Sequence, residues 1–228
     1  MFRIGLPIAT LSALLVLAAL PFWVLAEERR QFPFFDVDGW ECHGRGCKPL
    51  RALHGAIVGE DADATHWFFS APAPVVRALA CANALAFRIS HPEFDSRGVN
   101  PLSDFDIVVV SHALNMSLGL ASIVSPWAIM TEASVSLDGS LQGGERGKDV
   151  WVRLDHRGGP MPDGVPTTPR EVRSVMEQAS ALLIRGSFYA GAEVTCIERL
   201  QVTLMEGCVS SHSKRVYTHT YRCLCIHI

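Results

Sequence analysis

Residues 167–204 read TTPREVRSVMEQASALLIRGSFYAGAEVTCIERLQVTL, and they hold the clearest local signals in the chain. Thr168 is a favourable helix N-cap, Pro169 stands at the first helical position, and Glu171 follows three residues after the cap. The threonine hydroxyl and the glutamate carboxylate can then satisfy free N–H groups at the helix start, in a capping box. A helix is therefore predicted from Pro169 to about Ala181.

Apolar spacing supports this helix and predicts two strands after it. One apolar stripe at helical spacing comprises Val172, Val175, Met176 and Ala179. The short apolar run 182–189, which Gly186 interrupts, predicts one strand. Gly191 marks a turn, and alternating apolar residues over 194–204 predict a second strand.

Upstream of the helix the sequence predicts further short strands, separated by turn and loop segments. These strands cover residues 55–60, 67–70, 79–90, 105–110, 118–124, 133–137 and 150–154. In the third of them, one face has Leu85, Phe87 and Ile89, and the other face has Ala84, Ala86 and Arg88. Many short strands with one helix predict a mostly β protein, an antiparallel β-sandwich.

The length of 228 residues suits one domain, or one domain with appendages. We predict a linker over 27–38, a folded domain over 39–207 and a tail over 208–228. The formal net charge is −3 and the sequence has no basic stripe, so we expect no nucleic-acid partner.

The N-terminal segment 1–26 has the features of a signal peptide. Arg3 precedes a long apolar run, and small residues precede a cleavage site after Ala26. Pro21 favours cleavage; the alternative is an uncleaved anchor over 4–26, which is the only membrane contact we expect. Either way the chain enters the secretory route, and we expect a secreted, extracellular protein with Asn115 as an N-glycan acceptor.

Seven cysteines in a secreted chain favour disulfides. Cys42 and Cys47 enclose a short Gly-containing loop that suits a local bridge, and Cys81 and Cys196 are candidates for pairing across the fold. The others are Cys208, Cys223 and Cys225, in the tail. Because seven is odd, at least one thiol is free, is paired between chains, or belongs to a wrongly assigned end of the sequence.

The tail 208–228 has no acidic residue and no strand-like pattern. One interpretation is a metal-binding end with Cys223, Cys225 and His227 as ligands, although Cys-x-Cys-x-His matches no common zinc pattern. The interpretation we prefer is a disordered or mispredicted terminus, such as translated intron.

Several segments together resemble the laminin IV type A (laminin B) domain over 39–204. They are Gly39-Trp40, Gly55-Ala-Ile-Val58, Trp67-Phe-Phe-Ser-Ala-Pro72, Leu85-Ala-Phe87, Asp106-Ile-Val-Val109, Val150-Trp-Val152, the helix from Pro169, Leu182-Leu-Ile-Arg-Gly-Ser-Phe-Tyr189 and Glu198-Arg-Leu-Gln-Val202. The sequence departs from the family at 74–77 and at Glu198-Arg199, and it has no flanking EGF-like modules. An isolated module is therefore expected.

The resemblance implies a jelly-roll-like β-sandwich in the extracellular matrix that binds a glycan or a matrix protein and has no enzymatic activity. Fold alone does not fix function. The alternatives are a ligand-free structural spacer, or a truncated fragment of a larger multidomain surface protein. A secreted hydrolase is the remote alternative.

Carboxylates near the ends of the predicted sandwich are candidate ligands of a structural calcium ion, the only cofactor we consider. They are Asp36, Asp38, Glu60, Asp61, Asp63 and Glu198. The competing interpretation is that Asp61 and Asp63 are solvated turn formers.

Two tryptophans and one arginine on predicted strands have two possible roles. Trp67 and Trp151 are expected in the core, and sugar stacking is the alternative. Arg185, between apolar neighbours, is expected to be a paired structural arginine because a buried charge needs a partner.

Hydrolase chemistry lacks a suitable motif. No Gly-x-Ser-x-Gly turn is present, and the nine histidines show no His-Glu-x-x-His spacing. Ser111 and His112, with Asp104 or Asp106, form the one local Ser/His/Asp set. Neighbours on a strand point to opposite faces, so this set is poorly placed and we expect a non-enzymatic protein.

Overall fold

The computed structural model describes residues 29–31, 37, 39–44, 46–61, 66–94, 105–120, 124, 128–137, 151–154, 167–189, 191–205 and 208. The predicted signal segment 1–26 and residues 209–228, with Cys223, Cys225 and His227, lie outside them. Within the described residues, no helix combines the length and apolar character needed to cross a bilayer.

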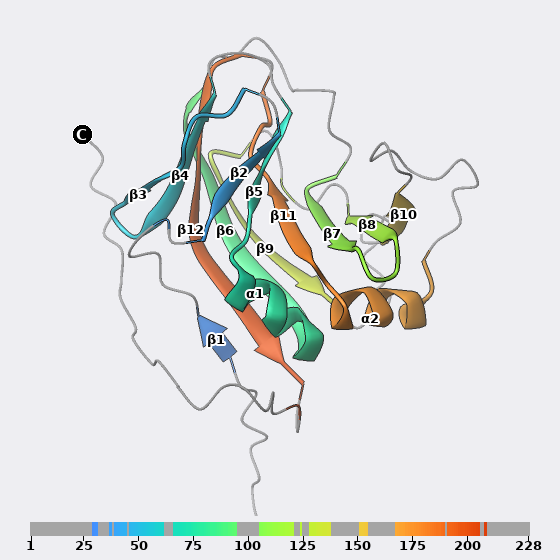
Figure 1. Ribbon diagram of the computed structural model, residues 1–228. Helices are drawn as coiled ribbons and strands as arrows, with labels where there is room; N and C mark the ends of the chain where they lie inside the picture. Colours follow the sequence, from blue (N-terminus) through green and yellow to red (C-terminus); the bar gives the residue numbers. More distant parts are fainter. Residues whose placement is uncertain are drawn as a thin grey trace, which may run out of the picture.

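The described residues form twelve strands, two α-helices and one 3₁₀ turn, which Figure 1 labels along the chain. The strands are β1 (Arg29–Gln31), β2 (Glu41–Gly44), β3 (Arg51–Leu53), β4 (Ala56–Asp61), β5 (Trp67–Ser70), β6 (Ala82–Phe94), β7 (Ile107–Ser111), β8 (Met116–Leu120), β9 (Met130–Ser136), β10 (Val152–Leu154), β11 (Ala181–Arg185) and β12 (Glu193–Leu204). The helical elements are α1 (Ala73–Ala78), η1 (Leu79–Cys81) and α2 (Pro169–Glu177).

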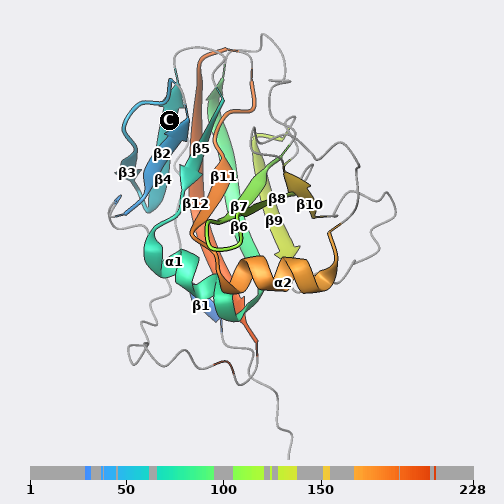
Figure 2. The same ribbon diagram turned by 45° about the vertical axis from the view of Figure 1, so that its right-hand side comes forward.

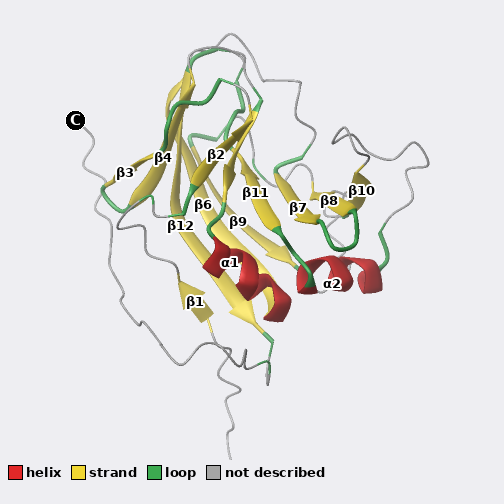
Figure 3. Ribbon diagram, in the orientation of Figure 1, coloured by secondary structure: helices red, strands yellow, loops and turns green. Residues whose placement is uncertain are grey.

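The strands form two antiparallel sheets that face each other, as Figure 3 shows. The first, here called sheet A, has the order β3-β4-β12-β6-β9, with β1 paired to β12. The second, sheet B, has the order β10-β8-β7-β11-β5-β2. The predicted antiparallel β-sandwich is therefore confirmed.

Strands β6 and β12 form the centre of sheet A because both alternate apolar and polar residues over a long register. Leu85 lies opposite Val202, and Phe87 lies opposite Leu200. All four side chains are buried in the main core between the sheets. Since side chains alternate along a strand, Ala84, Ala86 and Arg88 project from the opposite, outer face of sheet A, as their spacing predicted.

Trp67 belongs to the main core and is the largest side chain described there that is completely buried. A Cβ atom added at Gly59 or at Gly186 would lie 2.2 Å from an atom of its indole ring. Only glycine can occupy these two positions while the ring keeps its place, so Gly186 serves packing in addition to ending β11.

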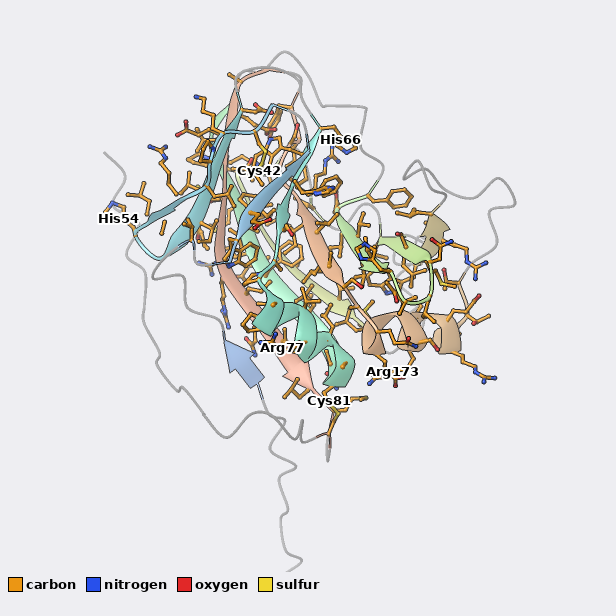
Figure 4. All side chains as sticks on the ribbon, viewed as in Figure 1. Cys42, His54, His66, Arg77, Cys81 and Arg173 are labelled. Atoms are coloured by element: carbon orange, nitrogen blue, oxygen red, sulfur yellow. A yellow bond between two sulfur atoms is a disulfide. The ribbon has the colours of Figure 1, made fainter. Side chains whose placement is uncertain are left out.

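The helices close one end of the sandwich (Figure 2). At the start of α2, Thr168 Oγ1 accepts from the Glu171 amide at 3.3 Å, and Glu171 Oε2 accepts from the Thr168 amide at 2.9 Å. The predicted capping box is present. Arg173 of α2, labelled in Figure 4, donates to the Ala82 carbonyl at 3.0 Å and to the Ala80 carbonyl, which joins α2 to η1.

Several local predictions need correction. The single predicted helix is accompanied by a second, α1, at the segment expected to be a loop followed by a strand. Helix α1 has Pro72 as its N-cap without a side-chain cap hydrogen bond, so it has no local signal comparable to the capping box of α2. Burial of Val75, Val76 and Ala78 stabilises it instead. Strand β6 consequently begins at Ala82 and runs on to Phe94.

Three short strands lie where loops were expected. Strand β1 falls in the predicted linker, and β2 and β3 lie between that linker and the first predicted strand at 55–60. Each is three or four residues long and pairs with a strand already in a sheet. Neighbouring strands therefore determine them, and their own short sequences do not.

Disulfides join Cys42 to Cys47 and Cys81 to Cys208. The suggested Cys81–Cys196 pair is wrong: the Cα atoms of Cys81 and Cys208 are 5.6 Å apart, whereas Cys196 lies far along β12, opposite Ser90. Cys208 thus belongs to the folded domain, although the sequence placed it in the tail. Cys81, labelled in Figure 4, lies at the end that carries the helices.

Candidate functional site

A groove of about 470 Å³ crosses the outer face of sheet A, over β6, β9 and β12. Its volume falls in the range of small-molecule binding clefts. The residues that line it are Ala84, Ala86, Phe87, Arg88, Glu132, Ala133, Ser134, Arg199, Gln201 and Thr203. We call it the sheet A groove.

Strand register explains why this surface is hollow. Ala86 of β6 lies between Gln201 of β12 and Ser134 of β9. One step along the strand, Ala84 lies between Thr203 and Ser136. Methyl groups therefore form the floor. Ser134 is exposed on the β9 side, whereas Gln201 and Thr203 on the β12 side are buried.

The groove ends at a row of charged residues. Arg88 lies between Arg199 and Glu132 in the register. Arg88 Nε donates to Glu132 Oε1 at 2.9 Å, and this hydrogen bond is the main reason that the pKa of Glu132 lies below its usual value. A shift of register between Ile197 and Arg199 also brings Glu198 to this row, where its carboxylate lies 3.8 Å from the Arg88 guanidinium.

The two arginines of this row have different surroundings. Glu198 also accepts from Ser90 Oγ at 2.6 Å, which fixes the carboxylate beside Arg88. Arg199 donates to the neutral amide oxygen of Gln201 at 3.2 Å, and in the described part of the chain it makes no ion pair. In this row, carboxylates therefore flank the Arg88 guanidinium, and no described carboxylate contacts the Arg199 guanidinium.

The lining residues suit binding better than catalysis. Hydroxyl and amide groups donate and accept hydrogen bonds, and guanidinium groups donate them, which is the chemistry that holds polyols and anions. Among its lining residues there is no histidine, cysteine or paired carboxylate to act as base or nucleophile.

A second polar cluster lies inside the sandwich, where Asp61, His91, Arg185, Tyr189 and Glu193 are all buried. Asp61 accepts from the Glu193 amide at 3.3 Å, and Arg185 lies 3.5 Å from Asp106. Because solvent does not reach it, this cluster is structural.

The ionisation of this inner cluster is strongly perturbed. Burial, opposed by the Phe188 amide that donates to Glu193 Oε1 at 2.7 Å and reinforced by Asp61, raises the pKa of Glu193 to about 7. Burial, together with nearby Arg185, lowers the pKa of His91 to about 4. Both groups are therefore neutral over the same range of mildly acid pH.

The described calcium candidates do not meet. Glu60 forms ion pairs with Lys48 at 3.4 Å and with Arg51. Asp61 instead accepts a hydrogen bond from Trp67 inside the core. Glu198 lies four residues along β12 from Val194, the partner of Glu60. The described residues contain no cluster of three or more metal-ligating side chains. The remaining candidates, Asp36, Asp38 and Asp63, lie outside the described residues.

The other predicted residues take the following places. Trp67 and Trp151 are buried, so their expected core role is confirmed. Arg185 is buried and paired with Asp106, as expected.

No Ser/His/Asp catalytic set forms among the described residues. Ser111 is buried and its hydroxyl accepts from the Leu114 amide at 3.3 Å, whereas His112 is exposed in the next turn. Asp106 is engaged with Arg185, and Asp104 lies outside the described residues. Asn115 is exposed in the turn between β7 and β8, with a left-handed φ of 48°.

Sequence reasoning missed the groove but identified part of its floor, because alternation placed Ala84, Ala86 and Arg88 on one face. It gave no sign that Arg199 and Gln201 lie beside them, since the pairing of β12 with β6 is a tertiary fact.

No family model and no curated protein matches the chain. Among solved structures it is similar to the L4b domain of human laminin alpha-2, with a TM-score of 0.50 and 10% sequence identity, covering 68% of this chain and 83% of that one. The expected resemblance to a laminin-type domain is confirmed at the level of fold, and at this identity it establishes the fold alone.

Proposed function

We propose that this chain is a non-enzymatic module of the extracellular matrix that binds a polysaccharide in the sheet A groove. The observation that carries the proposal is the groove itself: a floor of Ala84 and Ala86, with the exposed Glu132 and Ser134 of β9 on one side and the exposed Arg199 of β12 at one end. A sugar chain needs a trough with accessible hydrogen-bonding groups, and these three side chains supply them.

The location rests on separate observations. Disulfides persist in oxidising compartments, and the described residues contain two. A structural neighbour is a laminin domain, which suits a matrix module. Asn115 lies on an exposed turn, which suits the predicted N-glycan. A mobility shift on glycosidase treatment of secreted protein, lost in Asn115→Gln, tests that modification.

The binding proposal is tested by presenting the full chain to an array of matrix polysaccharides. Ala86→Trp fills the groove floor without entering the core, so binding should fall at least tenfold. Ala52→Trp is the matched control, because Ala52 is exposed on β3, at the opposite edge of sheet A from β9. Circular dichroism melts check that both variants fold.

Silence of the wild-type chain across the array would support the ligand-free spacer instead. Binding that Ala86→Trp and Ala52→Trp leave equally intact would mean that a ligand exists but that this groove does not hold it. If the ligand is instead a protein, the chain should still bind matrix proteins whose glycans have been removed.

A further inference from the structure

The charged row at the end of the sheet A groove constrains the kind of polysaccharide that fits. Two arginines, Arg88 and Arg199, lie directly opposite each other on neighbouring strands. Like charges in this position repel and destabilise the strand pair. A chain that keeps such a pair on its surface must balance it with opposite charge.

The carboxylates of the protein are distributed unevenly between the two arginines. Glu132 and Glu198 both lie beside Arg88, with Nε to Oε1 at 2.9 Å and guanidinium to carboxylate at 3.8 Å. Arg199 is exposed and has only the neutral Gln201 amide as its hydrogen-bond partner among the described residues. The Arg199 charge thus faces the groove without a carboxylate in contact with it, and its more distant attraction to Glu132 is the smallest of the effects on the pKa of that carboxylate.

We infer that the ligand is an acidic polysaccharide whose anionic group binds Arg199. This inference rests on the proposed function and specifies its substrate class. A guanidinium donates two parallel hydrogen bonds to one carboxylate or sulfate, which makes such contacts stronger than those between neutral groups. An anion at Arg199 also screens the repulsion from Arg88.

The rest of the groove holds the uncharged part of the sugar. Beside the alanine floor, Ser134 of β9 is exposed, whereas Gln201 and Thr203 of β12 are buried, with 5% and 8% exposure. The Ser134 hydroxyl can donate to and accept from sugar hydroxyls. The acid group therefore lies at the Arg199 end and the hydroxyls lie over Ala86 and Ala84.

The test measures the affinity of the full chain for three soluble probes. Hyaluronan fragments carry carboxylates, dextran sulfate carries sulfates, and dextran is neutral. The inference predicts binding to at least one acidic probe and at least tenfold weaker binding to dextran. Few charges are involved and the formal net charge is −3. Higher salt should therefore lower the affinity for the acidic probe modestly and leave the affinity for dextran unchanged.

Variants locate the contact. Arg199→Gln should weaken the acidic probe about tenfold, the loss expected for one charge-assisted pair of hydrogen bonds, and Arg199→Lys should restore part of it. Arg77→Gln is the matched control, because Arg77 is an exposed arginine on α1, which lies at the end of the sandwich. The two acidic probes tell whether carboxylate or sulfate is preferred.

The outcomes separate this inference from the proposed function. Equal binding of dextran and acidic probes, with Ala86→Trp disruptive and Arg199→Gln neutral, overturns the acidic ligand and keeps the groove. No effect of either variant overturns both. Equal binding of polyglutamate overturns the polysaccharide in favour of an acidic peptide.

Discussion

The indole Nε1 of Trp67 donates to the buried carboxylate of Asp61 across 3.2 Å, inside the sandwich. Asp61 also accepts from the Glu193 amide, so one carboxylate joins β4, β5 and β12. A side chain that was a candidate calcium ligand and turn former is thus part of the core. The same indole is enclosed by glycines, which gives the first test of the packing.

Gly186→Ala should destabilise the domain by about 3 kcal/mol, because the new Cβ would lie 2.2 Å from the Trp67 ring and a packed core resists added volume. Urea unfolding measures the loss. Trp67→Phe removes the part of the ring that the Cβ meets, so the double variant should lose less than the sum of the single variants. Additive losses would mean that Gly186 is required for another reason.

Arg185→Met should cost about 3–5 kcal/mol, because it leaves the buried Asp106 carboxylate without its guanidinium partner. Chemical denaturation gives the value. Arg77→Met on the exposed face of α1 is the control and should stay within about 0.5 kcal/mol of wild type. Equal, small effects of both variants would contradict a buried ion pair.

Loss of the Cys81–Cys208 disulfide should destabilise the domain more than loss of Cys42–Cys47. The first closes a sequence separation of 127 residues and the second one of 5, which correspond to about 5 and about 2 kcal/mol of unfolded-chain entropy. Paired serine variants compare the two in thermal melts. Peptide mapping without reduction should recover Cys81 linked to Cys208; a Cys81–Cys196 peptide would refute this connectivity.

Glu193→Gln should change how stability depends on pH. The folded-state pKa of Glu193 is raised from 4.5 to about 7, so its contribution to stability is fully present below pH 4.5 and is lost as pH rises towards 7. That loss amounts to about 3 kcal/mol. Urea unfolding at several pH values gives the free energy of unfolding of each protein. The value for wild type minus the value for Glu193→Gln should fall by this amount between pH 4.5 and 7.

His91 acts in the opposite direction and serves as the companion test. Its pKa is lowered from 6.5 to about 4, so its contribution is present above pH 6.5 and is lost as pH falls towards 4. In wild type the two contributions offset each other between pH 4.5 and 6.5. Glu193→Gln should expose the His91 dependence as a rise in stability with pH; a flat profile in the variant would contradict burial of His91 as the neutral form.

The elements that sequence predicted well are those with local signals. The capping box of Thr168 and Glu171 fixed the start of α2, and alternation fixed β12 to within a residue. Capping groups lie three residues apart and alternation needs only neighbours, so both operate before any tertiary contact forms. The sandwich class follows from many such short strands.

The tertiary structure decided what depends on partners distant in the chain. It formed α1 by burial, paired Cys81 with Cys208, and drew Asp61 into the core. It also brought Arg199 beside Arg88, 111 positions earlier in the numbering, and so created the charged end of the groove. The contact between Arg88 and Arg199 depends on strand register. Register is a property of two paired strands, and the sequence of one strand alone does not specify it.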